Sequence, residues 1–275
     1  MYKISRVAAR SASLLRSLNI GYILSVTRTE DVPNFTSAQL VDSEPPDIKY
    51  EFVQRHIDIQ DDPTEDILIH LKGACDWIKA GLDSGQHKAK DDDQTQVGVL
   101  VHCTQGISRS GSIIIAYCEF IYLYEFCILF LLMHVLPATH PYYLSNLTLR
   151  AVMRGLSLDY AAALSLAKES RPLIAPNQGF EAQLNVWGQC KYDIFIHDPG
   201  SAIPREKYAY KELKSIRDDL IGRGEEAVNR VRVASMASMA ASFGKRRLQS
   251  IEDAKGKKDG EGKDEKQSAN PMSRQ

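Results

Sequence analysis

Paired cysteines are missing from the sequence. Structural zinc sites and disulfide frameworks depend on paired spacing such as C-x-x-C, so the sequence excludes both and predicts no metal ion and no other cofactor. Unpaired thiols are typical of a reducing compartment, and we therefore expect a cytoplasmic or nuclear protein. The five scattered cysteines are Cys75, Cys103, Cys118, Cys127 and Cys190.

An excess of charge of either sign is also missing. The 275 residues include 34 Lys and Arg against 35 Asp and Glu, which gives a formal net charge of −1 at pH 7. A protein that mainly binds nucleic acid carries surplus positive charge, so the charge balance excludes this function. With 44% hydrophobic and 25% charged residues, the composition is that of a globular protein, not of a disordered or collagen-like chain.

Three short apolar segments predict β-strands, at residues 20–27, 50–59 and 97–101. The last of them is a continuous apolar run, which is typical of a strand in the centre of a sheet. Helical patterns lie before the first strand, between the other two and after the third. The sequence therefore predicts an α/β fold with a small central mixed sheet flanked by helices.

Two of these helical segments have informative starts. Asp62 suits a helix N-cap, Pro63 suits the first helical position and Glu65 suits a capping box. Apolar residues then recur at helical spacing as far as Leu82. The first 25 residues carry four basic side chains and no acid, which fits either a mitochondrial transit peptide or a domain helix. We favour the helix, because the segment runs without a break into the first strand.

The segment after the third strand carries the chemistry. The run from His102 to Ser110 (HCTQGISRS) places a cysteine at the end of the strand and an arginine six positions later, where a helix at 110–120 is predicted. Backbone N–H groups at a helix N-terminus bind a phosphate dianion, and the same positive potential favours a thiolate at Cys103. Arg109 can bind two phosphate oxygens with its planar guanidinium, and Gly106 lets the backbone turn tightly around the anion.

In this run and in three other segments, the chain resembles the dual-specificity branch of the cysteine-based protein tyrosine phosphatases. The resemblance implies a protein tyrosine phosphatase-like fold with a strand–phosphate loop–helix active site. It also implies hydrolysis of phosphotyrosine and phosphoserine or phosphothreonine in phosphorylated proteins, through a cysteinyl-phosphate intermediate. Within residues 8–187, the resembling segments are ILSVT (23–27), HIDIQDDPTEDIL (56–68), VLVHCTQGISRSGSIIIAY (99–117) and SLDYAAALSLAKESRPLIAPNQGFEAQL (157–184).

The resemblance assigns roles to individual residues. Cys103 matches the nucleophile, Arg109 matches the phosphate-binding arginine, and Ser110 matches the hydroxyl that helps the thiolate leave. His102 matches a histidine that braces the loop and favours the thiolate, and Asn177 matches a residue that supports the loop from behind. The remaining loop residues are expected to bind the phosphate: Thr104, Gln105, Gly106, Ile107 and Ser108.

Hydrolysis also needs a general acid to protonate the leaving oxygen. The resemblance aligns Asp61 with the aspartate that has this role in the family and that later activates water. Asp62 is adjacent and chemically capable. We prefer Asp61 as the acid, because Asp62 is better used as the helix cap before Pro63.

Other functions are weighed against this one. The loop has no lysine to meet the extra phosphates of a phosphoinositide, and the basic surroundings expected of an RNA 5′-triphosphatase are missing. A competing hypothesis is a catalytically impaired scaffold, which would keep the loop only to bind phosphoproteins. The presence of a thiol, an arginine and a candidate acid favours catalysis, because a pure binding module needs no nucleophile.

An apolar block interrupts the resemblance at about residues 120–152, so that Tyr117 and Ser157 lie much farther apart than in the family. It fits a membrane-spanning helix at 120–136, an added helix that packs on the domain or a partner, or translated intron sequence. We disfavour the membrane, because one crossing would put the two halves of a domain on opposite sides. We favour the intron, because family-like sequence resumes cleanly at Met153.

The sequence therefore predicts three parts. Residues 1–195 would form the catalytic domain, interrupted at 120–152, and residues 196–244 a helical extension. Residues 245–275 are rich in Lys, Glu, Gly and Ser, which predicts a disordered tail. The family has a strand before the first helix, and we expect it to be missing because the chain starts too close to that helix.

Overall fold

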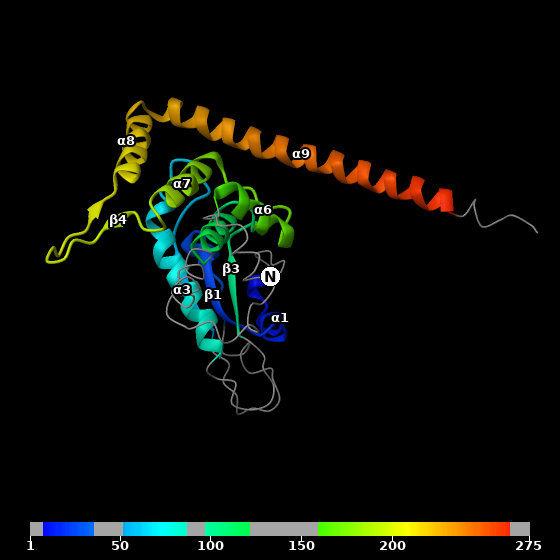
Figure 1. The fold of residues 1–275 in the computed structure, drawn as a ribbon, viewed down its shortest axis with the longest axis horizontal. Helices are drawn as coiled ribbons and strands as arrows, with labels where there is room; N and C mark the ends of the chain where they lie inside the picture. Colours follow the sequence, from blue (N-terminus) through cyan, green and yellow to red (C-terminus); the bar gives the residue numbers. More distant parts are fainter. Residues whose placement is uncertain (1–7, 36–51, 87–96, 122–158, 265–275) are drawn as a thin grey trace, which may run out of the picture.

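The described parts of the chain form a small parallel sheet with helices on both faces (Figure 1), which confirms the predicted α/β fold. No helix in these parts is long and apolar enough to cross a membrane. From residue 122 onward, the apolar block lies outside the described residues. Its three interpretations therefore concern residues that the structure does not describe. The computed structural model describes residues 8–35, 52–86, 97–121 and 159–264.

The central strand of the sheet is β1 (Ile20–Val26), which pairs in parallel with β2 (Val53–Ile57) and β3 (Gly98–His102). All pairings described in this sheet are parallel, since α3 (Leu68–Gln86) carries the chain from the end of β2 back to the start of β3. Ser25, near the end of β1, is in register with the ends of both neighbours. The carboxyl ends of the three strands therefore meet at one edge, where ligands bind in such sheets.

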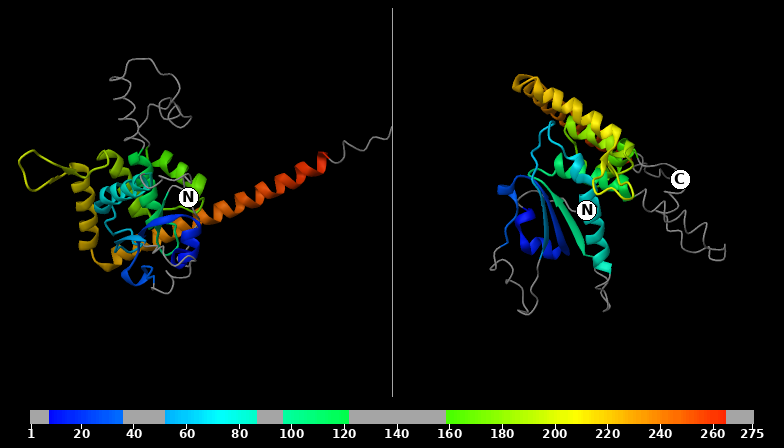
Figure 2. Two further views of the ribbon diagram at one scale, coloured as in Figure 1. Left: turned by 90° about the horizontal axis from the view of Figure 1, so that it is seen from below. Right: turned by 90° about the vertical axis from the view of Figure 1, so that its left-hand side faces the viewer.

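Helices lie on opposite faces of the sheet (Figure 2). Two hydrophobic clusters, one on each face, pack them against it. On one face, Leu15 of α1 (Ala12–Ser17) packs with Ile23 of β1. On the other face, Leu24 belongs to the larger cluster, with side chains from α3 and from the helix that begins at residue 109. Burial of β1 on both sides explains why its sequence is an almost continuous apolar run.

Side chains close the N-termini of two later helices. Asp159 Oδ1 accepts a hydrogen bond from Ala162 N at 2.8 Å and caps α6 (Tyr160–Ser170). Asn177 caps α7 (Gln178–Gln189) in the same way. Such caps satisfy backbone donors that a helix cannot pair internally.

Helix α3 begins later than the sequence predicts. We expected a start at Pro63 with Asp62 as the cap, but the helix starts at Leu68. Asp62 Oδ1 instead accepts hydrogen bonds from the backbone and the hydroxyl of Thr64, at 2.9 and 2.6 Å. Such local bonds compete with a helix and stabilise a turn, so the chain reaches α3 through an extra non-helical segment. Asp66 closes the actual start, where its Oδ1 accepts from Ile69 N at 3.3 Å.

The C-terminal part consists of a short hairpin and two helices. Strands β4 (Phe195–Ile196) and β5 (Arg205–Glu206) pair in an antiparallel sense and lead to α8 (Tyr208–Gly222), which packs against α7. Helix α9 (Glu225–Asp264) crosses the domain and then extends well beyond it (Figure 1).

The course of α9 differs from the predicted tail. Residues 245–264 are helical, whereas composition predicted disorder from residue 245. Low hydrophobicity argues against packing into a core, but Lys, Glu, Gln, Arg and Ala all have high helix propensity, so a solvated helix is compatible with the same composition. The predicted domain boundaries at residues 195 and 244 remain predictions.

Candidate active site

The candidate nucleophile lies at the edge of the sheet where the three strands end. Strand β3 ends at His102, the loop 103–108 follows, and a helix occupies residues 109–121. Cys103 is buried, and its Sγ accepts hydrogen bonds from Gly106 N at 3.1 Å and from Ser110 Oγ at 3.2 Å. Two donors, one from the backbone and one from a hydroxyl, are therefore directed at this one sulfur.

A tight turn brings the Gly106 N–H to the sulfur. Gly106 has φ +69°, a left-handed conformation that residues with a Cβ rarely adopt. A Cβ at this position would also lie 2.6 Å from Nη2 of Arg171, which donates to the carbonyl of Gln105 at 2.9 Å. Arg171 therefore packs directly on the loop, a contact that no sequence pattern indicated.

The segment before α7 supports the loop from behind. Asn177 N donates to Ser108 Oγ at 3.0 Å, and Ala175 N donates to the carbonyl of Ile107 at 3.2 Å. The carbonyl of Ser108 accepts from the backbone N and the hydroxyl of Ser112, at 2.7 and 2.9 Å. Ser108 is buried and fully engaged, so it holds the loop in shape.

His102 binds the neighbouring strand. Its Nε2 lies 2.8 Å from Ser25 Oγ on β1, and the ring is buried. Burial is the main cause that lowers the pKa of His102 to about 4, and Arg10 adds to the effect. The imidazole is therefore neutral at physiological pH, and it braces the end of β3 rather than bringing a positive charge to Cys103.

Arg109 is buried at the first turn of the helix, and its guanidinium crosses to the ends of the other strands. Nη1 donates to the carbonyl of Ile59 at 3.1 Å, and Nη2 donates to Thr104 Oγ1 at 2.9 Å. Nε is buried, makes no hydrogen bond among the described residues and lies 4.0 Å from Asp61 Oδ2. The arginine thus links the loop to the acid expected opposite it.

The two candidate acids have different partners. Asp61 Oδ1 accepts a hydrogen bond from Asn177 Nδ2 at 2.9 Å, while its Oδ2 is the atom near Arg109. Asp62 bonds Thr64 and forms an ion pair with Arg232 of α9. Asp61 is therefore the carboxylate that lies beside Arg109, whereas Asp62, which lines the same cleft, is bound by Thr64 and Arg232.

Asn177 joins both sides of the site. Its backbone supports the loop, its Oδ1 caps α7 by accepting from Phe180 N at 2.9 Å, and its Nδ2 holds Asp61. Next to it, Gly179 allows close packing, because a Cβ there would lie 1.9 Å from the carbonyl oxygen of Pro63. The sequence indicated loop support by Asn177, but it gave no signal for the contact with Asp61.

A polar cleft of about 360 Å³ opens between these groups. Arg109, Thr104 and both candidate acids, Asp61 and Asp62, line it, together with rim residues that sequence reasoning missed. Thr104 Oγ1 also donates to Asp31 Oδ2 at 3.3 Å, so one rim acid contacts the loop directly. The other missed rim residues are Arg28, Glu30 and Gln60.

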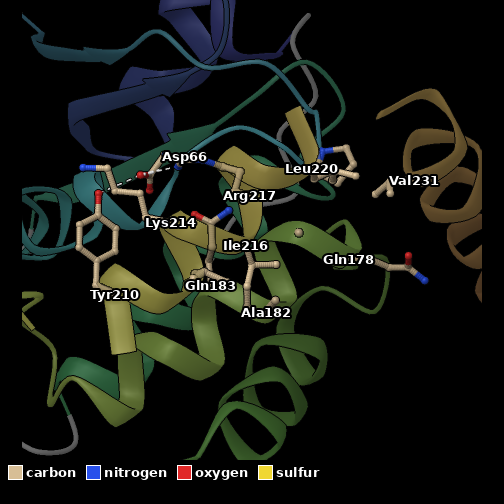
Figure 3. A pocket seen from close by; sticks show the side chains of 13 residues that line it. Asp66, Gln178, Ala182, Gln183, Tyr210, Lys214, Ile216, Arg217, Leu220 and Val231 are labelled. Carbon is tan, nitrogen blue, oxygen red and sulfur yellow. Dashed lines mark hydrogen bonds and ion pairs between the residues drawn. The ribbon is translucent and has the colours of Figure 1, made fainter. Parts of the chain in front are cut away.

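A second pocket, of about 200 Å³, lies between α7, α8 and the start of α9 (Figure 3). Its walls are mainly apolar, and none of its lining residues comes from the loop 103–108. In the described ranges, no group of three or more His, Cys, Asp or Glu residues is arranged to hold a metal ion. The polar cleft is therefore the candidate active site.

Three sequence relatives illustrate what the chain is similar to. The dual specificity protein phosphatase MPK-4 of Drosophila melanogaster is 28% identical over 188 residues, which cover 68% of this chain and 34% of the relative. Dual specificity protein phosphatase 19 of Mus musculus is 30% identical over 184 residues, 66% of this chain and 56% of the relative. Dual specificity phosphatase 28 of Homo sapiens is 29% identical over 128 residues, 46% of this chain and 47% of the relative. The chain thus spans between about a third and just over half of the length of these relatives.

Solved structures give further matches. The Yvh1 phosphatase domain from Chaetomium thermophilum is 30% identical, with a TM-score of 0.44, and the match covers 68% of this chain and 90% of that one. Human DUSP28(Y102H) is 24% identical, with a TM-score of 0.41, and the match covers 69% and 86%. No protein-family model matches the chain.

The parallel sheet with a cysteine, a tight loop and a helix at its carboxyl edge is the arrangement that the resemblance to cysteine-based protein tyrosine phosphatases implied. Within that superfamily, the sequence relatives identify the chain as a homologue of the dual-specificity phosphatases. The resemblance stated from the sequence is confirmed.

Proposed function

We propose that the chain is a phosphoprotein phosphatase that hydrolyses phosphotyrosine and phosphoserine or phosphothreonine through a cysteinyl-phosphate intermediate. The observation that carries the proposal is the pair of hydrogen bonds that Cys103 Sγ accepts from Gly106 N and Ser110 Oγ. A thiolate at the start of a helix, beside a buried arginine and a carboxylate, has the groups that phosphoryl transfer requires.

In the first step, Cys103 Sγ attacks phosphorus in line, and the bond from phosphorus to the leaving oxygen breaks as the S–P bond forms. Asp61 gives its proton to the leaving oxygen, which departs as an alcohol or a phenol. The loop N–H groups and the Arg109 guanidinium stabilise the charge on the phosphoryl oxygens.

In the second step, water attacks the same phosphorus while Asp61 removes a proton from it. The S–P bond then breaks, and the electron pair returns to Cys103 Sγ. Ser110 Oγ, which donates to that sulfur at 3.2 Å, stabilises the departing thiolate. The products are inorganic phosphate and the regenerated enzyme.

The loop and the cleft support phosphoproteins as substrates. Arg109 is the one charged residue between His102 and Ser110, so the site suits a single phosphate better than a polyanionic lipid. Thr104 and Gln105 are polar but neutral, and Arg28, Glu30 and Asp31 also line the cleft. We infer that both aromatic and aliphatic phosphoresidues bind in this cleft and reach the sulfur.

The test is a steady-state assay of the full chain on p-nitrophenyl phosphate and on peptides with one phosphotyrosine or one phosphothreonine. We expect turnover of all three, loss of turnover in Cys103→Ser, and a covalent phosphoenzyme trapped by acid quench in the active protein. Turnover that persists in Cys103→Ser contradicts the proposed nucleophile.

One observation favours the alternative of a non-catalytic scaffold. The Arg109 guanidinium is already engaged with the Ile59 carbonyl and with Thr104, and a phosphate must displace part of these contacts. A scaffold binds the phosphopeptides, as measured by calorimetry, without releasing phosphate. Binding without turnover in the folded full chain would therefore favour the scaffold.

A further inference from the structure

The segment that carries the candidate acid is fastened by the C-terminal helices. Arg232 of α9 forms an ion pair with Asp62, with Nε 2.5 Å from Oδ2. Arg232 is itself oriented on its own helix, because its Nη1 contacts Glu225 Oε1 at 2.6 Å and Asn229 Oδ1 at 3.1 Å. The guanidinium is thus held on both sides, which makes it a fixed anchor for residue 62.

Asp62 uses both of its oxygens. Oδ1 forms the turn with Thr64, and Oδ2 receives Arg232. Burial opposes ionisation of Asp62, but the hydrogen bonds from Thr64 and Arg232 outweigh it and hold the pKa of the carboxyl below its ordinary value. Asp62 is therefore ionised at neutral pH and depends on Arg232 for its counter-charge.

The other end of the acid segment is fastened by α8 (Figure 3). Asp66 Oδ2 accepts a hydrogen bond from Tyr210 at 2.9 Å and lies 2.6 Å from Arg217 Nη1. Both partners lie on α8, whereas Arg232 lies on α9, so two helices hold the two ends of the same segment, residues 62–66.

The first part of α9 is packed firmly enough to act as a support. Ser235 is buried, and its Oγ accepts a hydrogen bond from Gln178 N at 3.2 Å, at the start of α7. Val228 is also buried, one turn before Arg232. Asn177, which holds Asp61, directly precedes Gln178, so α9 is joined to the acid segment by two routes.

We propose that Arg232 is a positioning residue for the general acid: its ion pair with Asp62 fixes the backbone at residue 62 and thereby keeps Asp61 facing Arg109 and Cys103. This inference rests on the proposed phosphatase function. Arg232 is not among the residues that line the cleft, but it binds Asp62, which is, so it acts on the site through Asp62. Reactions that depend strongly on Asp61 should therefore depend on Arg232.

The leaving group provides the kinetic readout. Phenyl phosphate has a poor leaving group and needs the acid, whereas 2,4-dinitrophenyl phosphate has a good one and needs it little. In Arg232→Ala, we expect kcat to fall about fivefold on phenyl phosphate and less than about twofold on 2,4-dinitrophenyl phosphate. A variant that is merely less folded loses activity equally on both substrates.

Two further variants define the contact. Asp62→Asn keeps the oxygen that accepts from Thr64 but removes the charge that Arg232 binds, so it should reproduce Arg232→Ala, and the double variant should lose no more. Arg232→Lys should restore part of the rate on phenyl phosphate, because the charge remains.

The matched control is Arg205→Ala. Arg205 also forms an ion pair with an aspartate, Asp198, at 2.7 Å, but on the hairpin strand β5 and not on the acid segment. Its loss should leave the ratio of the two substrate rates unchanged. An equal change of that ratio in Arg205→Ala and Arg232→Ala contradicts positioning by Arg232.

Hydrogen exchange tests the inference independently of turnover. In the full chain with Arg232→Ala, amides of residues 61–67 should exchange faster than in the original protein, while those of residues 104–109 should not change. If the original protein is inactive but Arg232→Ala still exchanges faster at residues 61–67, the proposed phosphatase function is refuted, while the role of Arg232 in fixing this segment is supported. Unchanged exchange at 61–67 together with an unchanged substrate ratio overturns the positioning.

Discussion

The loop around Cys103 and the segment around Asp61 face each other across one cleft, but they are built in opposite ways. The sulfur receives its hydrogen bonds from residues three and seven positions away in the sequence, Gly106 and Ser110. Asp61 receives its hydrogen bond from Asn177, 116 positions away, and its neighbour Asp62 is bound by Arg232, 170 positions away.

The difference separates two physical tasks. A sulfur anion needs converging backbone donors at a helix start, and one short run of chain can supply them. A general acid must lie across from the nucleophile at hydrogen-bond reach of the substrate, and only distant elements can hold it there. We therefore expect damage to the loop to affect phosphate binding and every substrate, and damage to the acid segment to affect mainly substrates with poor leaving groups.

The largest effect is expected at Arg109. Arg109→Lys keeps the charge but loses the planar pair of donors, so kcat/KM should fall about 10²- to 10³-fold on good and poor leaving groups alike. Steady-state kinetics on the two aryl phosphates measures this, with the exposed rim residue changed in Arg28→Lys as the control. If Arg109→Lys lowered kcat/KM only on phenyl phosphate, the proposed division of tasks between the loop around Cys103 and the segment around Asp61 would be wrong.

The next effect is expected at Asp61. Asp61→Asn cannot donate a carboxyl proton, so kcat on phenyl phosphate should fall about 10²-fold, with a much smaller fall on 2,4-dinitrophenyl phosphate. Asp62→Asn, one residue away, serves as the control and should show only the severalfold loss expected from a positioning contact. The reverse order of the two variants would assign the acid role to Asp62.

Asn177 should show a mixed effect, since it serves both regions. Asn177→Ala removes the cap of α7 and the contact with Asp61, so it should destabilise the protein by about 1 kcal/mol and slow phenyl phosphate turnover roughly tenfold. Asp159→Ala removes the equivalent cap of α6 and should cost similar stability without changing kcat. Urea unfolding and kinetics on both variants separate the two contributions, and equal losses of kcat would show that Asn177 acts only through stability.

The smallest effect on catalysis is expected at Glu119, in the helix that follows the loop. Glu119 is buried, neither carboxylate oxygen has a hydrogen-bond partner among the described residues, and burial raises its pKa to about 8. A carboxyl with a raised folded-state pKa contributes stability that is fully present below its ordinary pKa and is lost as the pH rises through about 8.

Glu119→Gln should remove this pH dependence. The free energy of unfolding of the variant, relative to the original protein, should increase by about 1 kcal/mol per pH unit between about pH 5 and pH 8. Urea unfolding at several pH values measures the difference, and Glu169→Gln, at an exposed site on α6, controls for loss of one charge. A constant difference across this range would show that Glu119 is ionised in the folded protein.

The sequence predicted the elements whose signals are local. The three strands, the buried apolar face of α3 from Leu71 to Ile78 and the strand–loop–helix around Cys103 all lie where the patterns indicated. The predicted start of α3 was wrong, because Asp62, which can cap a helix, instead closes a turn with Thr64. Its other carboxylate oxygen is bound by the distant Arg232, a contact that no local pattern indicates. Disorder was predicted after residue 245, but a helix continues there to residue 264. The composition shows that this segment cannot pack into a core, but it does not exclude a solvent-exposed helix.

What the sequence determined by itself is the loop of the candidate nucleophile, because a thiol, a glycine turn and an arginine within seven residues need only a strand and a helix around them. What only the tertiary structure decided is which of the two neighbouring carboxylates lies beside Arg109. Asp61 and Asp62 are the same residue type at adjacent positions, and the helix cap by Asp62, for which we preferred Asp61 as the acid, does not form, since α3 starts at Leu68. The distinction arises from Asn177 and Arg232, because each binds a different one of the two carboxylates, and Asp61 is the one that lies beside Arg109.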